Sequence, residues 1–272
     1  MSKVLCYIFS CGDRFKSLAN CAGRSFKQWH PHIDTLWEHY TEIKNEPVLG
    51  LAKFKYAYNA VTKGNYDKVI ILGSDTITCS YLNEFFNNKE DILCTLDYPY
   101  RLKTPYVTTP RDGHVNADVV CFNNINALND VINLAINYPT VYHEQGALNQ
   151  LLYSSNIYIQ EYGPITKYTS KIVDAPYDRS NVIYNARAKG NIVAESGSKP
   201  WKKYTTQFKV IDNKLISYDN KHIKVWHYCD GLGGLSNEGF NELINKWKLE
   251  WFNTQTKQFF TSQCNCGDFF NP

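Results

Sequence analysis

A short apolar segment that ends in a turn and a carboxylate stands out in the first third of the chain. Residues 66–86 read YDKVIILGSDTITCSYLNEFF, and the run at 68–72 is rich in valine and isoleucine and too short for a helix. Such a run, bounded by turn residues, predicts a strand buried on both faces. It stops at Gly73-Ser74-Asp75, and a helical pattern starts near Ser80, a candidate N-cap. Ligands of open α/β sheets bind at the carboxyl ends of the strands, so we expect Asp75 to hold a divalent metal there.

Strand and helix patterns alternate around this segment. The sequence predicts strands at 3–10, 33–40, 68–72, 92–96 and 116–123, and helices at 15–29, 49–63, 128–138 and 144–153. The opening order of strand, helix, strand, helix, strand is typical of an α/β protein with a mostly parallel central sheet flanked by helices. The turn after the first strand has too little glycine for a dinucleotide-binding fingerprint, and the sequence contains no P-loop.

The alternation loosens after Tyr162, where short strands and turns are expected instead. A hairpin is predicted at 207–224 and an amphipathic helix at 238–252. A loop at 98–113 contains three prolines, and we expect it to cover the site. The predicted organisation is one domain at residues 1–205 with a smaller C-terminal extension at 206–272 packed on it.

Composition argues against several classes of function. The net charge of +3 over 272 residues is small and the basic residues form no stripe, unlike those of a nucleic-acid binder. No apolar run approaches the roughly 20 residues of a transmembrane helix. Met1-Ser2-Lys3 leads straight into a strand, so we expect no signal peptide. Most of the nine cysteines lie in apolar segments, which predicts reduced core thiols in a cytoplasmic protein. The aromatic content of 15% suits either stacking on sugars and bases or an aromatic-rich core.

Four stretches follow one another in a particular order: residues 66–86, VNADVVCFN, HEQGALNQLL and GSKPWKKY. Together they resemble the retaining glycosyltransferases of family 8, which include glycogenin and bacterial lipopolysaccharide galactosyl- and glucosyltransferases. The resemblance covers residues 1–205 and implies the GT-A fold, a Rossmann-like arrangement. It also implies a UDP-sugar donor, a hydroxyl acceptor on a glycan or protein, and Mn²⁺ (or Mg²⁺) bridging the donor's two phosphates. Oxygen and imidazole ligands suit these metals.

The resemblance assigns metal ligands to two places in the chain. The family's aspartate-x-aspartate motif falls on Gly73, Ser74 and Asp75, so only its last acid is present. The family's histidine ligand falls on Ala194, which offers no ligand atom. His227, in KVWHYCDGLGG, follows an apolar strand and is the candidate to replace that histidine. The alternatives are a turn carboxylate for Asp75 and a structural histidine for His227.

The segment SCGDRF, after the first strand, is similar to the family's uridine-binding segment. Phe15 falls where an aromatic ring stacks on uracil, and Ser10 and Asp13 fall near the base and ribose. Phe15 is equally suited to be the first core residue of the following helix.

Basic residues at two further places are expected to contact the donor. Lys53 or Lys55, both expected along the sides of the helix at 49–63, falls near the family's phosphate-contacting residue. Lys199 resembles the lysine that pairs with the diphosphate, a role that suits a point charge, although it could simply be exposed before a Pro-Trp turn. The remaining nucleotide-sugar contacts are predicted at Ser74, Asp75 and Gly197.

The segment HEQGALN stands where the family has H-D-Q-D-A-L-N. Gln145 keeps the glutamine that lies beneath the anomeric carbon, Glu144 replaces one acid and Gly146 replaces the other. The resemblance implies front-side attack, with polar groups stabilising the sugar cation. We therefore predict Glu144 and Gln145 as catalytic residues, with Asn116 and Asp118 lining the sugar pocket. Alternatively, Glu144 is only a first-turn acid favoured by the helix dipole.

These observations predict a metal-assisted retaining glycosyltransferase that moves glucose or galactose from a UDP-sugar to a hydroxyl. One alternative is a degenerate relative that binds a sugar nucleotide or glycan without catalysis, because three polar family positions are Gly73, Ala194 and Gly146. Another alternative is a nucleotidyltransferase that makes sugar nucleotides. Such an enzyme would need a glycine-rich loop after the first strand, and SCGDRFKS lacks the glycines.

Overall fold

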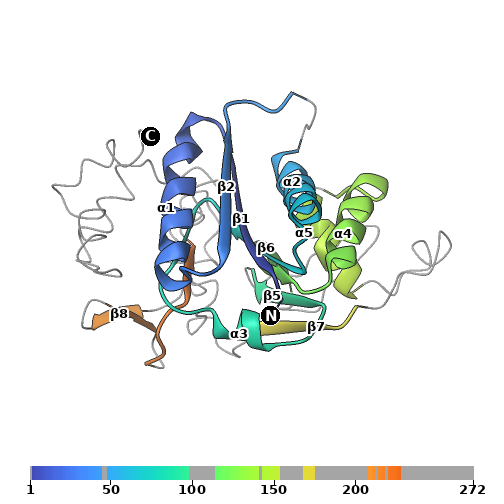
Figure 1. Ribbon diagram of the computed structural model, residues 1–272. Helices are drawn as coiled ribbons and strands as arrows, with labels where there is room; N and C mark the ends of the chain where they lie inside the picture. Colours follow the sequence, from blue (N-terminus) through green and yellow to red (C-terminus); the bar gives the residue numbers. More distant parts are fainter. Residues whose placement is uncertain are drawn as a thin grey trace, which may run out of the picture. The chain divides into compact units, whose positions relative to one another are not determined.

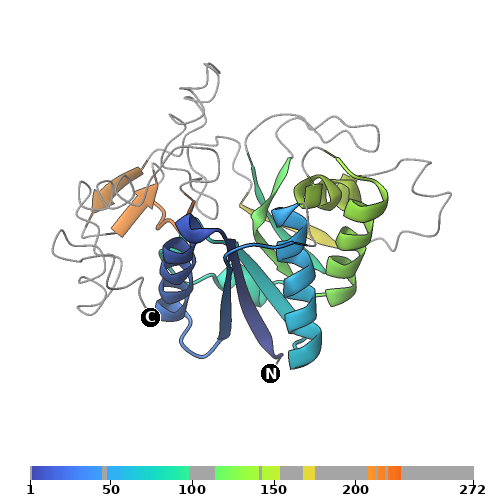
Figure 2. The ribbon, with the colours of Figure 1, turned by 90° about the horizontal axis from the view of Figure 1, so that it is seen from above.

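The computed structural model describes residues 2–44, 48–97, 114–140, 143–153, 168–174, 208–211, 214–217 and 220–227 (Figures 1 and 2). The loop predicted at 98–113, the helix predicted at 238–252 and the boundary predicted after residue 205 lie outside these residues. Within the described part, no helix has the length and apolar composition required to cross a membrane.

The described strands form one large sheet and two small ones. The large sheet contains β1 (Val4–Cys11), β2 (Asp34–Tyr40), β3 (Lys68–Gly73), β5 (Ile92–Leu96), β6 (Val115–Phe122) and β7 (Ser170–Asp174), in the spatial order β2-β1-β3-β6-β5-β7. β6 is antiparallel to its neighbours β3 and β5, whereas β7 is parallel to β5. Strands β3, β5 and β7 therefore run in one direction. The predicted α/β class with a mostly parallel sheet is confirmed, and β6 is the strand that breaks the parallel pattern.

The chain divides into two compact units, of which the first comprises Met1–Tyr7, Ile43–Leu72 and Asn83–Ala175. Its helices are α2 (Leu49–Gly64), α3 (Asn83–Asn87), α4 (Ile125–Asn137) and α5 (His143–Tyr153). Helices α2, α4 and α5 pack on one another, as Figures 1 and 2 show. Every residue of β3 and β5 is buried, which explains why these strands are continuous apolar runs instead of alternating ones.

The second unit comprises Ile8–Glu42, Gly73–Leu82 and Pro176–Pro272. It contains α1 (Asp13–Trp29), the short strand β4 (Thr76–Thr78), β8 (Phe208–Ile211), β9 (Lys214–Ser217) and β10 (Val225–His227). Helix α1 packs on β2 and β4. Its inward face consists of the buried side chains of Leu18, Cys21, Ala22, Ser25 and Phe26. Strands β8 and β9 form an antiparallel hairpin, as predicted.

Strand β4 was not predicted, and it changes the element that follows. Thr76, Ile77 and Thr78 are all β-branched, and they pair antiparallel with β10, with His227 opposite Thr76 and Val225 opposite Thr78. This pairing keeps residues 76–78 extended. Helix α3 consequently begins at Asn83, after the position near Ser80 where a helical pattern was expected to start.

Candidate active site

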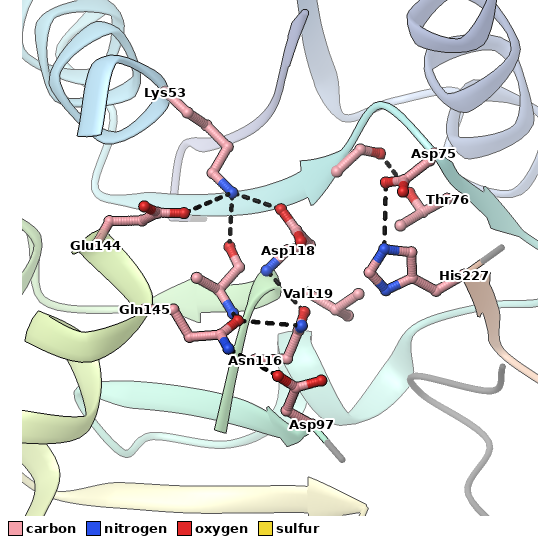
Figure 3. A network of polar contacts seen from close by, with 12 residues as sticks. Lys53, Asp75, Thr76, Asp97, Asn116, Asp118, Val119, Glu144, Gln145 and His227 are labelled. Carbon is pink, nitrogen blue, oxygen red and sulfur yellow. Dashed lines mark hydrogen bonds and ion pairs between the residues drawn. The ribbon is translucent and has the colours of Figure 1, made fainter. Parts of the chain in front are cut away.

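The turn after β3 brings together the two residues that were predicted as metal ligands. The Thr76 hydroxyl donates a hydrogen bond to the Gly73 carbonyl at 2.7 Å, which closes the turn. Asp75 lies in the turn, and the pairing of β10 with β4 places His227 opposite Thr76, the residue after Asp75. The distance from His227 Nε2 to Asp75 Oδ1 is 3.2 Å, and their side chains are 3% and 14% exposed (Figure 3).

This pair can serve as part of a metal site or as an ion pair. Two ligands at right angles on a Mg²⁺-sized ion, with bonds of about 2.0–2.1 Å, would lie about 3 Å apart. The observed 3.2 Å is compatible with that arrangement and equally with a hydrogen bond to a charged histidine. Gly73 contributes no side chain, and no three His, Cys, Asp or Glu side chains of the described part gather as a metal site. The described part of the protein therefore offers two ligands here, Asp75 and His227.

A second polar cluster, in the first unit, surrounds Lys53 of α2 (Figure 3). The expectation that Lys53 lies along the side of its helix is wrong, because its side chain is only 7% exposed. Its Nζ atom lies 2.5 Å from Asp118 Oδ1, donates to the Ala117 carbonyl at 3.2 Å, and lies 3.7 Å from Glu144 Oε1. A buried ammonium group requires such partners, since its desolvation costs several kcal/mol. Lys53, rather than Lys55, is the basic residue of α2 that enters this cluster.

Glu144, near the start of α5, is less exposed than Asp118, with 14% of its side chain exposed against 33%. Burial raises the pKa of its carboxyl group, Lys53 opposes that rise, and Asp118 adds to it. The carboxylate also contacts the first turn of α2, because a Cβ atom on Gly50 would overlap it. Glu144 thus has one cation and the positive end of a helix beside it, both of which favour its charged form.

Gln145 connects the start of β6 to the end of β5. Its Oε1 atom accepts hydrogen bonds from the Ala117 amide at 3.1 Å and from Asn116 Nδ2 at 3.3 Å. Its Nε2 atom donates to Asp97 Oδ2 at 2.7 Å, and Asn116 Oδ1 accepts from the Asp118 amide at 2.8 Å. Both ends of the Gln145 amide are therefore bound to the protein, and its orientation is fixed.

Two residues of this cluster were not among the predicted site residues. Asp97 is the first residue after the buried strand β5 and Asp75 is the second after β3, so a similar sequence signal could have identified Asp97. His114 is fully buried, with its Nε2 atom 3.4 Å from Gln145 Nε2 and its Nδ1 atom 3.9 Å from Asp97 Oδ2. Which ring nitrogen of His114 carries the hydrogen depends on the tautomer. No sequence pattern marked His114.

Gly146, which stands at the position of a family acid, has no room for a side chain. A Cβ atom there would overlap the hydroxyl group of Thr140. The residue is buried in α5, so an aspartate could not be accommodated without moving Thr140. A side chain at position 146 would therefore require Thr140 to move.

The predicted nucleotide-binding residues are placed as follows. Ser10 is buried, and its hydroxyl donates to the Glu38 carbonyl at 3.3 Å and lies 3.0 Å from His39 Nδ1, so β2 already engages it. Asp13 begins α1, Phe15 lies in the first turn of that helix with its side chain partly exposed, and Ser74 lies in the turn after β3. Ala194, Gly197 and Lys199 lie outside the described residues. The binding roles of these residues remain predictions.

No family model matches the chain, and no curated protein matches its sequence. Solved structures do resemble it. The bifunctional glycosyltransferase WbbM in its apo form has a TM-score of 0.53 at 11% identity, over 96% of this chain and 51% of that one. A glycosyltransferase involved in the glycosylation of the major capsid of PBCV-1 has a TM-score of 0.47 and 12% sequence identity. The match covers 88% of this chain and 98% of that one. The galactosyltransferase LgtC in complex with donor and acceptor sugar analogs has a TM-score of 0.41 and 14% sequence identity. The match covers 82% of this chain and 87% of that one.

The assignment of fold rests on the structural similarity to WbbM. The chain covers about half of WbbM, and at 11% identity the similarity concerns the fold alone. The protein accordingly has the α/β fold of GT-A glycosyltransferases, as predicted.

Proposed function

We propose that the protein is a retaining glycosyltransferase of the family 8 type, which transfers a hexose from a UDP-sugar to a hydroxyl acceptor. The observation that carries the proposal is the cluster around Lys53. Residues predicted as catalytic, as lining the sugar pocket or as contacting the donor's phosphate join, from three separate segments, in one network of hydrogen bonds and ion pairs. They are Lys53, Asn116, Asp118, Glu144 and Gln145.

The chemistry of the reaction fits the charges of this cluster. The acceptor oxygen bonds to the anomeric carbon on the face from which the diphosphate departs. The bond from that carbon to the phosphate oxygen breaks with its electron pair, and this oxygen takes the acceptor's proton. Positive charge develops on the sugar meanwhile, and preorganised carboxylates stabilise such charge. We assign this role to Glu144 and Asp118, with Lys53 holding both.

Gln145 receives a different role from the one that the resemblance implies. Its two amide ends are occupied by Asp97, Asn116 and the Ala117 amide. We therefore assign it as a positioning residue, which orients Asn116 and Asp97 toward the sugar.

Asp75 and His227 would hold Mn²⁺ or Mg²⁺, which would act as a Lewis acid on the departing diphosphate. His227 would then take over from the histidine that is replaced by Ala194.

Calorimetric titration of UDP with and without Mn²⁺ tests the donor and metal assignments together. We expect binding that strengthens sharply with Mn²⁺ and loses this dependence in Asp75→Asn. Asp67→Asn, at the other end of β3, is the control. Metal-independent binding would contradict the assignment of Asp75 and His227 as metal ligands. Absence of UDP binding would contradict the proposed donor, and the similarity to glycosyltransferases would then concern the fold alone.

Turnover of UDP-glucose and UDP-galactose, followed by proton NMR, tests catalysis and the retained configuration of the product. We expect hydrolysis with retention, and Glu144→Gln to reduce it at least about 10-fold, as loss of one preorganised stabilising group does. UDP-sugar binding without turnover would favour the non-catalytic alternative. The observation behind that alternative is the absence of a carboxylate at Gly73.

A further inference from the structure

Gly50 occupies a place in α2 that its backbone does not explain. It lies in the first turn of the helix. In the middle of a helix glycine is less favourable than alanine by about 2- to 5-fold in the folding equilibrium. Among the described glycines only Gly12 has a positive φ, so the conformation of Gly50 is open to any residue. A Cβ atom on Gly50 would overlap the Glu144 carboxylate, so a side chain at this position would displace that carboxylate.

The groups around Gly50 explain why a carboxylate lies against it. Lys53 follows three positions later, hence on the same side of α2, with its Nζ atom 3.7 Å from Glu144 Oε1. Helix α2 has Val48 at its N-cap, no side-chain cap and no acid in its first turn. The Glu144 carboxylate therefore supplies the negative charge that this end of the helix favours.

We propose that Gly50 is a positioning residue for Glu144: its missing side chain provides the space in which the carboxylate meets both Lys53 and the first turn of α2. The proposal rests on the function proposed above, in which Glu144 faces the reacting sugar. The family acid at this position is an aspartate, one methylene group shorter. Glu144 carries its carboxylate farther from α5, and the glycine accommodates the longer reach.

A double-mutant cycle in turnover tests this role. Gly50→Ala should lower kcat for UDP-sugar hydrolysis by about 10- to 100-fold, since a displacement of about 1 Å costs that much, with a smaller change in KM. In the Glu144→Asp background the shorter side chain clears the added methyl group, and Gly50→Ala should change kcat less than about 2-fold. Asn59→Ala, on the exposed side of the same helix, controls for the effect of adding an alanine. Equal kcat values for Gly50→Ala and Asn59→Ala would overturn the proposal.

A second cycle, in the free energy of unfolding, keeps the test independent of catalysis. In the Glu144→Ala background, Gly50→Ala should raise the folding equilibrium constant about 2- to 5-fold, as alanine in a helix does. In the wild-type background this gain should be absent. The same gain in both backgrounds would overturn the proposal. If the wild-type chain turns over no UDP-sugar, the proposed function fails, and the unfolding cycle alone decides whether Gly50 sets the position of Glu144.

Discussion

At the scale of single residues, the charge of Lys53 lies inside the protein and depends on three oxygen atoms. Asp118 and the Ala117 carbonyl are within hydrogen-bonding distance of its Nζ atom, and Glu144 is slightly farther away. Asp118 and Glu144 are the two acids that lie beside this lysine. Such a group is stable only as a whole, because removing one partner leaves the others buried and uncompensated.

Lys53→Met keeps much of the side-chain volume and removes the charge. We expect it to destabilise the fold by about 1–3 kcal/mol, less than a fully buried pair would, because Asp118 is 33% exposed and screened by water. UDP-sugar turnover should be lost. Urea unfolding measures the first effect, and Lys63→Met, on the exposed side of α2, should remain within about 0.5 kcal/mol of wild type. Equal stability of the two variants would contradict the role of Lys53.

His30 is a buried histidine outside the proposed site, at the end of α1. Its Nε2 atom accepts a hydrogen bond from the Leu82 amide at 3.1 Å, which requires an unprotonated nitrogen. Burial, and to a lesser extent the neighbouring His32 and Lys224, lower the pKa of His30 to about 4. The folded protein therefore binds fewer protons than the unfolded chain at pH values between about 4 and 6.5.

Stability should fall as the pH is lowered from about 6.5 to 4, by up to about 3 kcal/mol from His30 alone. His30→Gln retains an acceptor for the Leu82 amide but does not titrate, so part of this pH dependence should disappear. Urea unfolding of both proteins at several pH values measures the difference. Identical pH dependence in the variant would show that His30 does not contribute.

At the scale of elements, the pairing of β4 with β10 brings His227 next to Asp75. Neither strand is longer than three residues, and they come from distant parts of the sequence. Trp226, in the middle of β10, is 1% exposed and pairs with Ile77. The burial of Trp226 therefore stabilises the position of β10, the strand that contains His227.

Trp226→Ala should cost about 3–5 kcal/mol of stability, as large-to-small changes in a core do. Because His227 is the next residue of the strand, the dependence of UDP binding on Mn²⁺ should weaken in parallel. Trp226→Phe, which removes less volume, should show both effects to a smaller extent. Calorimetry on the fraction that remains folded separates binding from stability. Full Mn²⁺ dependence in the alanine variant would mean that β10 does not position a metal ligand.

The sequence predicted the elements whose signals are local. β5 was predicted with its observed bounds, β3 and α5 within one residue at an end, and α1 within two. β4 and the late start of α3 were not predicted, because three β-branched residues acquire a strand conformation only through pairing with β10. Lys53 was misplaced for a similar reason: charge suggests exposure, and only Asp118 and Glu144, on other segments, make its burial possible.

At the scale of the whole molecule, the order of the strands explains how distant segments of sequence form one cluster. β6 lies between β3 and β5, so the residues at its start pair with the end of β5. In the register, Thr95 faces Asn116, and the register shifts between Cys94 and Thr95, just before Asp97. Linear sequence could indicate that Asn116 and Asp118 belong to a site, but not that His114 joins them, since that depends on register.

A ligand that binds only the folded chain stabilises it by mass action, which gives a test on the intact protein. At a UDP concentration of about 100 times Kd, with Mn²⁺ present, the gain is about 2.7 kcal/mol. For a chain of this size that amounts to about 5–10 °C in Tm. Replacing Mn²⁺ with EDTA, or using Asp75→Asn, should remove most of the shift, because the charge of the diphosphate then lacks its counterion. An equally large shift with EDTA would mean that UDP binds without a metal, so that the contact of Asp75 with His227 serves the fold alone.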